Sequence, residues 1–451
     1  MNNLHLHKLF NKSIAWNTLE SVIYESIVIS HHILMFAIMG TAGYGFIGTL
    51  FSLIYLFAKL SNLGFDQSLP AFFTYFSKSK KNCSTYLITQ IGIQLIGLLL
   101  FFGTMLLFSS HITNWYPLLK NSSFSLFVTC VSLACVESIK RPLRKILQLS
   151  FKNHITALSE IFIISTYIFS VWTLYFLGCE LTPLLVLLPK LICTLIALLV
   201  IVVYICKWVN QLPNQQSDKL AIVGRIINNR LFNFFNQLTT NMFSSNILVP
   251  LTAGSLGLES AGILKICSNA AYTITGLIHT IFGQTGDALL AHTKDNHIIH
   301  SKHAFNLISS RINQVLYAVF IFSIINYKKI IILLSGSSTF PAITLYLLFV
   351  LVISENVFIA YERFFITHEQ SAFFMIFNIS ALGLLLSTLP YAQSVSATSA
   401  LLYIIIIRAC MFALISGYSY YKWHITPGIT PRPLFITGLV AISLCFFLMT
   451  S

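Results

Sequence analysis

Charged side chains inside apolar stretches are the residues of this chain best suited to chemistry. Four cations and two carboxylates each lie within a long hydrophobic run: Lys190, Lys265, Arg311, Arg408, Glu20 and Glu25. A charge deep in hydrocarbon costs at least about 2.5 kcal/mol unless it faces water or a partner, so such residues are usually functional. The cations could bind phosphate oxygens, and the carboxylates could bind H⁺ or Na⁺. The alternative is that ion pairs among these groups only brace the structure.

A row of amides and hydroxyls marks the stretch 229–250. Polar residues recur there at steps of three and four: Asn229, Asn233, Asn236, Thr240 and Ser244. A helix stacks them on one side, and a helix in lipid must turn such a face toward other helices or internal water. We expect a cavity wall that includes Asn233, Asn236, Gln237 and Thr240. Plain helix–helix hydrogen bonding is the alternative.

Further polar residues accompany these two groups. Lys265 shares one face of a predicted helix with Asn269, which we therefore add to the expected substrate site. In the first hydrophobic run, Glu20 and Glu25 are expected to bind a coupling ion. His31 and His32 could relay protons to them, or could simply lie in the headgroup zone.

The elements that must position these residues are membrane-spanning helices. The chain has 451 residues, of which 56% are hydrophobic and only 9% are charged, a composition that excludes a soluble domain. Thirteen apolar runs are long enough to span a bilayer. They are 14–39, 43–63, 85–108, 122–140, 155–177, 183–206, 229–250, 258–284, 304–325, 341–361, 371–390, 396–420 and 434–450. The connections between them are mostly too short to hold a separate domain.

The basic residues predict the orientation. The net charge is +14, and most Lys and Arg outside the spans fall on the side that holds the N-terminus, which predicts a cytoplasmic N-terminus. The clusters at 78–81 and 140–145 are the densest examples. The positive charge is therefore explained by topology and gives no indication of nucleic-acid binding.

An internal repeat divides the chain into two halves. Gly40 and Gly45 open the second span as Gly257 and Gly262 open the eighth. Asp66 and Asp287 follow at matching positions, where we expect gate or turn residues. We predict an all-α polytopic membrane protein with two six-helix bundles, related by a pseudo-two-fold axis, around a central cavity. The predicted divisions are a first lobe 1–206, a cytoplasmic linker 207–228, a second lobe 229–420 and an extra helix 434–450.

The segments LGLESAGILKICSNAAYTITGLIHT and NLGFDQSLPAFFTYFSKSKK resemble the multidrug/oligosaccharidyl-lipid/polysaccharide exporter superfamily, and within it the Wzx-like polysaccharide flippases. The resemblance covers about residues 10 to 420. It implies a flippase of the bacterial inner membrane, which moves an undecaprenyl-diphosphate-linked oligosaccharide to the outer leaflet for O-antigen or other polysaccharide synthesis. The expected partners are this lipid-linked oligosaccharide, membrane lipids, a polysaccharide polymerase and a chain-length regulator. No cofactor is expected beyond H⁺ or Na⁺ as coupling ion.

Other function classes remain as alternatives. A multidrug or metabolite exporter of the same superfamily is the first, although a drug site would not need several intramembrane cations. A flippase for peptidoglycan precursors is the second. A membrane glycosyltransferase or ligase is more remote, because the longest outer loops, 109–121 and 326–340, contain no Asp or Glu for catalysis. We therefore expect no enzyme.

Motifs for metal or redox chemistry are weak. The nine Cys include no CxxC pair, so no zinc or redox site is indicated. A run of four His, at positions 292, 297, 300 and 303, lies in a short basic loop and favours a solvated segment over a metal site. Glu137 precedes Arg141 by four residues, the favourable spacing for a structural ion pair on a helix.

Overall fold

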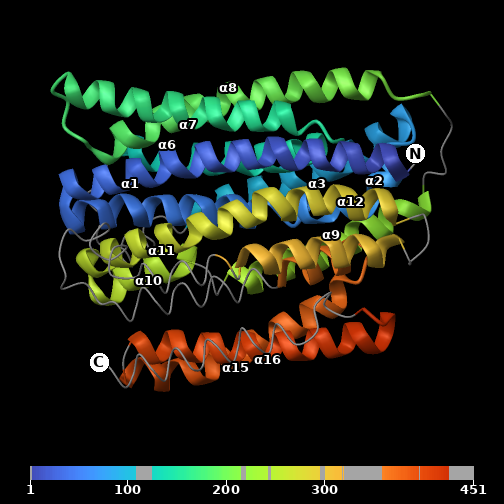
Figure 1. Ribbon diagram of the computed structural model, residues 1–451. Coiled ribbons are helices and arrows are strands. Elements are labelled where there is room, and N and C mark those ends of the chain that lie inside the picture. The colour runs from blue at the N-terminus through green and yellow to red at the C-terminus, as the bar shows by residue number, and fades with distance from the viewer. Residues whose placement is uncertain are drawn as a thin grey trace.

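The computed structural model describes residues 3–107, 124–214, 220–241, 245–294, 300–316, 318, 358–395 and 397–425. Within these ranges every regular element is helical, which confirms the predicted all-α class (Figure 1). The first half contains α1 (Asn3–Asn62), α2 (Phe65–Phe76), α3 (Lys80–Leu107), α6 (Phe124–Leu149), α7 (Asn153–Phe176) and α8 (Pro183–Asn210).

The second half begins with α9 (Leu220–Asn241), α10 (Ser245–Leu256) and α11 (Leu258–Ile278). A short π-helix, η1 (His279–Gly283), then leads into α12 (Gln284–Thr293). Residues 300–316 and 358–367 are also helical, and α15 (Ser371–Val395) and α16 (Ala397–Trp423) follow. The predicted thirteenth span 434–450, and most of the predicted span 341–361, lie outside the described residues.

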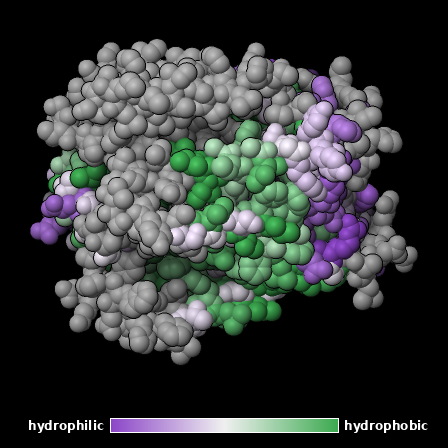
Figure 2. All heavy atoms as spheres, turned by 90° about the horizontal axis from the view of Figure 1, so that it is seen from below, coloured by the Kyte–Doolittle hydropathy of each residue, from purple (hydrophilic) through white to green (hydrophobic). Residues whose placement is uncertain are grey.

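The outer surface of the described helices is apolar, as a bilayer requires. Five of them are long and apolar enough to cross a membrane, among them α3, α7 and α8. Large aliphatic side chains such as Leu99 and Leu199 are more than half exposed. In Figure 2 an apolar belt covers the middle of the visible face, and hydrophilic residues gather mainly at one end. We conclude that this is a multi-pass membrane protein.

Glycines with left-handed backbone angles turn the chain at repeat-matched positions. Gly40 breaks α1 with φ 68°, so that α1 comprises the first two predicted spans. Gly257, with φ 89°, separates α10 from α11 in the same way. Such angles are readily adopted by glycine and strained for residues with a Cβ. We call the end of the bundle at Gly40 the Gly40 end, and the opposite end, where α1 meets α2, the α2 end.

A second pair of breaks lies near the α2 end. Leu63 and Gly64, both with positive φ, separate α1 from α2. At the matching point of the second half, η1 interrupts the path from α11 to α12. Each half therefore has a long helix pair that is broken twice, once by a turn at the Gly40 end and once near the α2 end. The predicted repeat is reproduced in the backbone itself.

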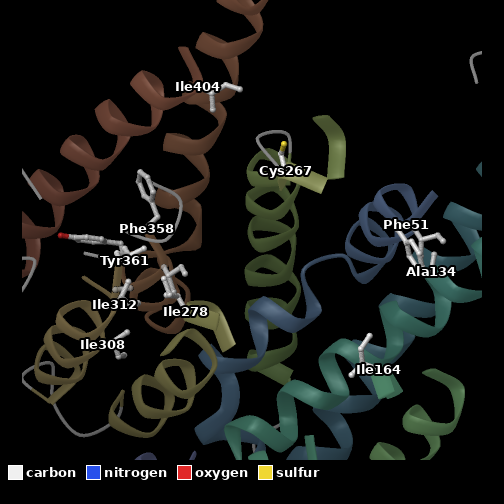
Figure 3. Packing of buried hydrophobic residues seen from close by; sticks show 14 of the residues in the cluster. Phe51, Ala134, Ile164, Cys267, Ile278, Ile308, Ile312, Phe358, Tyr361 and Ile404 are labelled. Carbon is white, nitrogen blue, oxygen red and sulfur yellow. The ribbon is translucent and has the colours of Figure 1, made fainter. Parts of the chain in front are cut away.

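One continuous cluster of buried apolar side chains runs through both halves. Phe51, Ala134 and Ile164 pack together in the first half, whereas Ile308, Ile312 and Tyr361 pack in the second (Figure 3). The helix α11, which carries Cys267, stands between the two groups in this view. The two halves are thus two lobes, and α11 lies where they meet.

The lobes touch most closely where α1 crosses α11 near the Gly40 end. A Cβ atom on Gly45 would lie 2.1 Å from the carbonyl oxygen of Leu258, and one on Gly262 would lie 2.1 Å from that of Thr41. Real Cβ atoms do not approach backbone so closely, so both positions accept only glycine without movement. The repeated glycine motif of the sequence is therefore a contact between the two lobes.

We predict opposite effects for two Gly→Ala substitutions. Ala is favoured over Gly inside a helix by about 1 kcal/mol. Gly92→Ala in α3, where a Cβ would meet nothing within 4 Å, should leave the melting temperature unchanged or raise it. Gly45→Ala should lower it by several degrees, because the backbones of α1 and α11 must separate. Thermal unfolding of the purified protein in detergent measures both, and equal melting temperatures would contradict the contact.

Candidate functional site

A cavity of about 730 Å³ lies between the lobes and is lined mainly by polar and charged residues. Its cations are Lys59, Lys140, Arg141, Arg144, Lys145, Lys190, Lys265, Arg363 and Arg408. Its carboxylates are Asp66, Glu137, Glu160 and Glu362. Glu20 and Asp287 pair with three of these cations from outside the lining, so nine cations face six carboxylates in all. The lining therefore suits an anion with a polar body.

The predicted site residues fall into two groups. Seven of them line the cavity: Lys190, Gln237, Thr240, Lys265, Asn269, Arg408 and Asp66. Six lie elsewhere: Asn233, Asn236, Arg311, Glu20, Glu25 and Asp287. Arg311 departs most clearly from the prediction, because its side chain is exposed on the helix 300–316. An arginine near the end of a span can reach the interface, which removes the need for an internal partner.

The amide row of α9 divides between the cavity and the packing of the second lobe. Asn233 Nδ2 donates to Asn229 Oδ1 at 2.8 Å, and Asn236 Nδ2 donates to the carbonyl oxygen of Ser371 at 2.9 Å. Both side chains are fully buried. The bond of Asn233 lies within α9, whereas that of Asn236 joins α9 to the start of α15, the helix–helix contact considered as the alternative for this stretch. Among the described residues of this stretch, Gln237 and Thr240 line the cavity wall.

The first lobe contributes a network of ion pairs, which we call the paired layer: Glu20, Glu137, Glu160, Lys140, Arg141 and Arg144. Lys140 Nζ lies 3.1 Å from Glu137 Oε1 and 3.2 Å from Glu160 Oε1. Arg144 contacts Glu20 and lies 3.3 Å from Glu160 Oε1. The expected contact of Arg141 with Glu137 is present at 3.9 Å. Three carboxylates thus meet three cations.

Sequence reasoning ended the fourth span at Lys140, placed Arg141, Arg144 and Lys145 in a loop, and did not consider Glu160. The structure extends α6 to Leu149, so that these cations lie on a helix that faces the cavity. Glu137, Lys140 and Arg144 follow at steps of three and four, which places them on one helical face. This spacing was the signal that could have extended the span beyond residue 140.

Polar contacts join the two lobes near the α2 end. Lys145 of the first lobe contacts Asp287 of the second, and Arg363 Nη1 lies 3.2 Å from Asp287 Oδ2. Beside them, Gln148 Nε2 donates to Gln284 Oε1 at 2.6 Å. Asp287 is completely buried. It therefore occupies a place consistent with its expected role at a gate.

Asp66 matches Asp287 in the repeat but has different contacts. Its Oδ1 accepts a hydrogen bond from the backbone N–H of Gln67 at 2.9 Å, in the first turn of α2. No ion pair of Asp66 is found among the described residues. It lies on the cavity wall beside the break at Gly64. Its placement fits the expected turn residue.

Arg230 of α9 is a further residue that sequence reasoning missed. Its guanidinium is buried and donates to the carbonyl oxygens of Asn62 at 2.9 Å and Leu63 at 3.0 Å. It also donates to the backbone and side-chain oxygens of Gln90, at 2.6 and 2.5 Å. Arg230 thus holds the break between α1 and α2 from the opposite lobe.

Asn17 of α1, in the first lobe, makes the corresponding contact with the broken helix of the second lobe. Its Nδ2 donates to the carbonyl oxygen of Thr280 at 3.0 Å and to Thr285 Oγ1 at 2.8 Å. Thr280 lies within η1, the break of the second lobe. Each lobe therefore binds the broken helix of the other near the α2 end.

Two predicted ion-coupling residues differ in their surroundings. Glu20 belongs to the paired layer through Arg144. Glu25 lies against α11, where a Cβ on Gly276 would be 2.1 Å from Glu25 Oε1. Because Gly276 has no side chain, the Glu25 carboxylate of the first lobe can lie directly against α11 of the second lobe.

Both ring nitrogens of His31 contact polar atoms of aromatic residues. Trp172 Nε1 lies 3.1 Å from His31 Nδ1, and Tyr167 Oη lies 3.2 Å from His31 Nε2. Indole N–H only donates, so Nδ1 must accept and the ring carries its proton on Nε2. His31 is therefore neutral in this conformation, with both nitrogens engaged. Its ring and that of His32 both line the cavity.

The His run gives no metal site in the part of the chain that is described. His292 Nε2 lies 3.2 Å from the carbonyl oxygen of Leu149, and His297 lies outside the described residues. No group of three or more His, Cys, Asp or Glu with a metal-binding arrangement occurs among the described residues.

The chain has the fold of MATE transporters. It matches an outward-facing MATE family transporter of the MOP superfamily with a TM-score of 0.70 at 12% identity, covering 92% of this chain and 96% of that one. A MOP superfamily transporter from Pyrococcus furiosus, described as having a binding pocket of reverse polarity, gives the same values. A MATE transporter from Vibrio cholerae matches with a TM-score of 0.65 at 10% identity, covering 93% and 98%. No family model matches, and no curated protein matches.

We predict that Asp287→Asn destabilises the protein strongly. It leaves Lys145 and Arg363 without their countercharge inside the protein, and breaking a buried pair in this way costs about 3–5 kcal/mol. Arg225→Gln is the matched control, because Arg225 pairs with Glu369 at 2.8 Å while its side chain is 62% exposed. Such a surface pair contributes about 0–1 kcal/mol. Urea or thermal unfolding compares the variants, and equal losses would contradict the assignment of Asp287.

Proposed function

We propose that this protein is a secondary transporter that moves an anionic substrate across the membrane by alternating access. The observation that carries the proposal is the cationic cavity between two lobes. The fold of the matched transporters supports it, and so do the lobe contacts at both ends, since access to either side requires one set to break. Gly45 and Gly262 mark one set, and Lys145 and Asp287 mark the other.

The proposed substrate is an undecaprenyl-diphosphate-linked oligosaccharide, moved from the inner to the outer leaflet. Its diphosphate would meet the cavity cations, and its sugar hydroxyls would meet amides and hydroxyls such as Gln237, Thr240 and Asn269. The basic residues support an orientation with the α2 end and the N-terminus in the cytoplasm. In a bacterial inner membrane, this end would face the compartment in which lipid-linked sugars are assembled.

A multidrug exporter is the second candidate, and the matched structures favour it more directly, because they are MATE transporters. The cavity also offers aromatic surface for an apolar drug: Tyr24, Phe51, Tyr55, Tyr167 and Phe358 line it. A cationic drug, however, would be repelled by the excess of positive charge in the cavity. This electrostatic argument is why we place the anionic substrate first.

Reconstituted vesicles separate the two candidates. Purified protein is inserted into liposomes that contain a fluorescent prenyl-diphosphate-linked sugar, and the label in the outer leaflet is followed with a membrane-impermeant quencher. A flippase should accelerate exchange of this lipid and should not move ethidium, a cationic drug probe. Accelerated ethidium transport without lipid exchange would overturn the flippase proposal and establish the exporter.

We expect Glu25→Gln to remove coupling to an ion gradient. Gln keeps the shape of the side chain in the gap at Gly276 but can neither release a proton nor carry charge for Na⁺. In the same vesicles, net transport by this variant should become independent of imposed H⁺ and Na⁺ gradients. Glu259→Gln in α11, an exposed position, is the control that should retain the dependence. Full gradient dependence in Glu25→Gln would reject Glu25 as the coupling carboxylate.

A further inference from the structure

Two lysines of the cavity lie at the same depth in opposite lobes. Lys190 is about two turns into α8 from its start at Pro183, and Lys265 is about two turns into α11 from its start at Leu258. Both helices start at the Gly40 end, so each lysine lies roughly 10 Å inside it. The paired layer lies deeper, toward the α2 end, because Lys140 and Arg144 belong to the last turns of α6.

Neither lysine has a carboxylate partner within ion-pair distance among the described residues. Lys265 Nζ donates to Ser52 Oγ at 3.1 Å, and its stem fills the space that Gly48 leaves beside it. Lys190 Nζ lies over the ring of Tyr167, 5.2 Å from its centroid. Their exposed fractions are only 4% for Lys190 and 7% for Lys265.

This arrangement is costly for an empty protein. A buried ammonium group without a countercharge loses much of its solvation free energy, and a hydroxyl or a ring face restores only part of it. The nearest carboxylates of the first lobe, Glu137 and Glu160, already meet Lys140 and its neighbours in the paired layer. Both lysines line the same cavity, where a ligand with two negative charges could supply the missing countercharges.

Resting on the proposed function, we propose that Lys190 and Lys265 together bind the diphosphate of the substrate, one lysine from each lobe. A diphosphate diester carries two negative charges, and a lysine binds phosphate oxygens as a point charge with three donors. The bound anion then links α8 to α11 across the cavity. Its attraction for both lysines holds the lobes together at the Gly40 end while the α2 end separates.

Binding of prenyl diphosphates to the full-length protein in nanodiscs tests this assignment. Farnesyl diphosphate is the probe, with farnesyl monophosphate and inorganic pyrophosphate as comparison ligands. Lys190→Met and Lys265→Met should each weaken farnesyl diphosphate binding by about tenfold or more, the effect of one lost charge-assisted hydrogen bond. Both should weaken monophosphate binding less. Lys207→Met, at an exposed lysine of the same helix α8, is the matched control that should leave affinity unchanged.

A second readout separates ligand binding from a structural role. Because Met removes an uncompensated buried charge, Lys265→Met should melt no lower than wild type without ligand. It should also lose most of the thermal stabilisation that farnesyl diphosphate gives the wild type. A lysine with a structural role would show the opposite pattern, with a lower melting temperature and normal ligand binding.

The outcomes distinguish this inference from the proposed function. Tight binding of farnesyl diphosphate to wild type and to both Met variants alike would overturn the lysine assignment and leave the anionic transporter standing. Equal binding of pyrophosphate and farnesyl diphosphate would show that free phosphate compounds, not lipids, are the source of the anion. No binding of any of these anions to wild type would overturn both proposals.

Discussion

The cost of burying charge where water is scarce is the constraint on which this structure depends. In hydrocarbon the backbone polar groups must be hydrogen-bonded, as they are in helices. A charged side chain there is costly unless it is paired or faces water. The first lobe satisfies this within itself, since Glu20, Glu137 and Glu160 meet three cations of α6. Nearer the Gly40 end, Lys190 and Lys265 have no carboxylate within ion-pair distance among the described residues. The cavity thus has a layer in which cations and carboxylates are paired and, nearer the Gly40 end, a layer in which the lysines are not paired with any carboxylate of the described part of the chain.

The proposed alternating access would use the repeat of the two lobes. The turns at Gly40 and Gly257 and the breaks at Gly64 and η1 occur at matched positions in the two lobes. The contacts that join the lobes are nevertheless different at the two ends. Backbone packing of Gly45 against α11 needs no desolvation of charge, whereas Lys145 and Asp287 must be solvated when they part. The two closures therefore differ in chemistry although the lobes share one architecture.

The sequence was sufficient to predict the helical class, the two-lobe repeat and three of the nine cavity cations. Apolar runs and matched glycines carry this information locally, so Lys190, Lys265 and Arg408 could be assigned to the interior. Pairing could not be predicted, because it depends on which helices meet. The amides of Asn233 and Asn236 are used within the second lobe for this reason. Arg144 was missed because a basic cluster at a span end also fits a cytoplasmic loop, and the pairing of Glu160 depends on a contact between α7 and α6.

The hydrogen bonds from Arg230 to the break between α1 and α2 have a consequence for assembly. The carbonyl oxygens of Asn62 and Leu63 belong to the first lobe, but their donor enters the membrane only with α9 of the second. During synthesis the first six spans are inserted before this arginine arrives. The joint at Gly64 therefore reaches its final hydrogen bonding only after the chain passes residue 230. Maturation of the first lobe is thus tied to translation of the second.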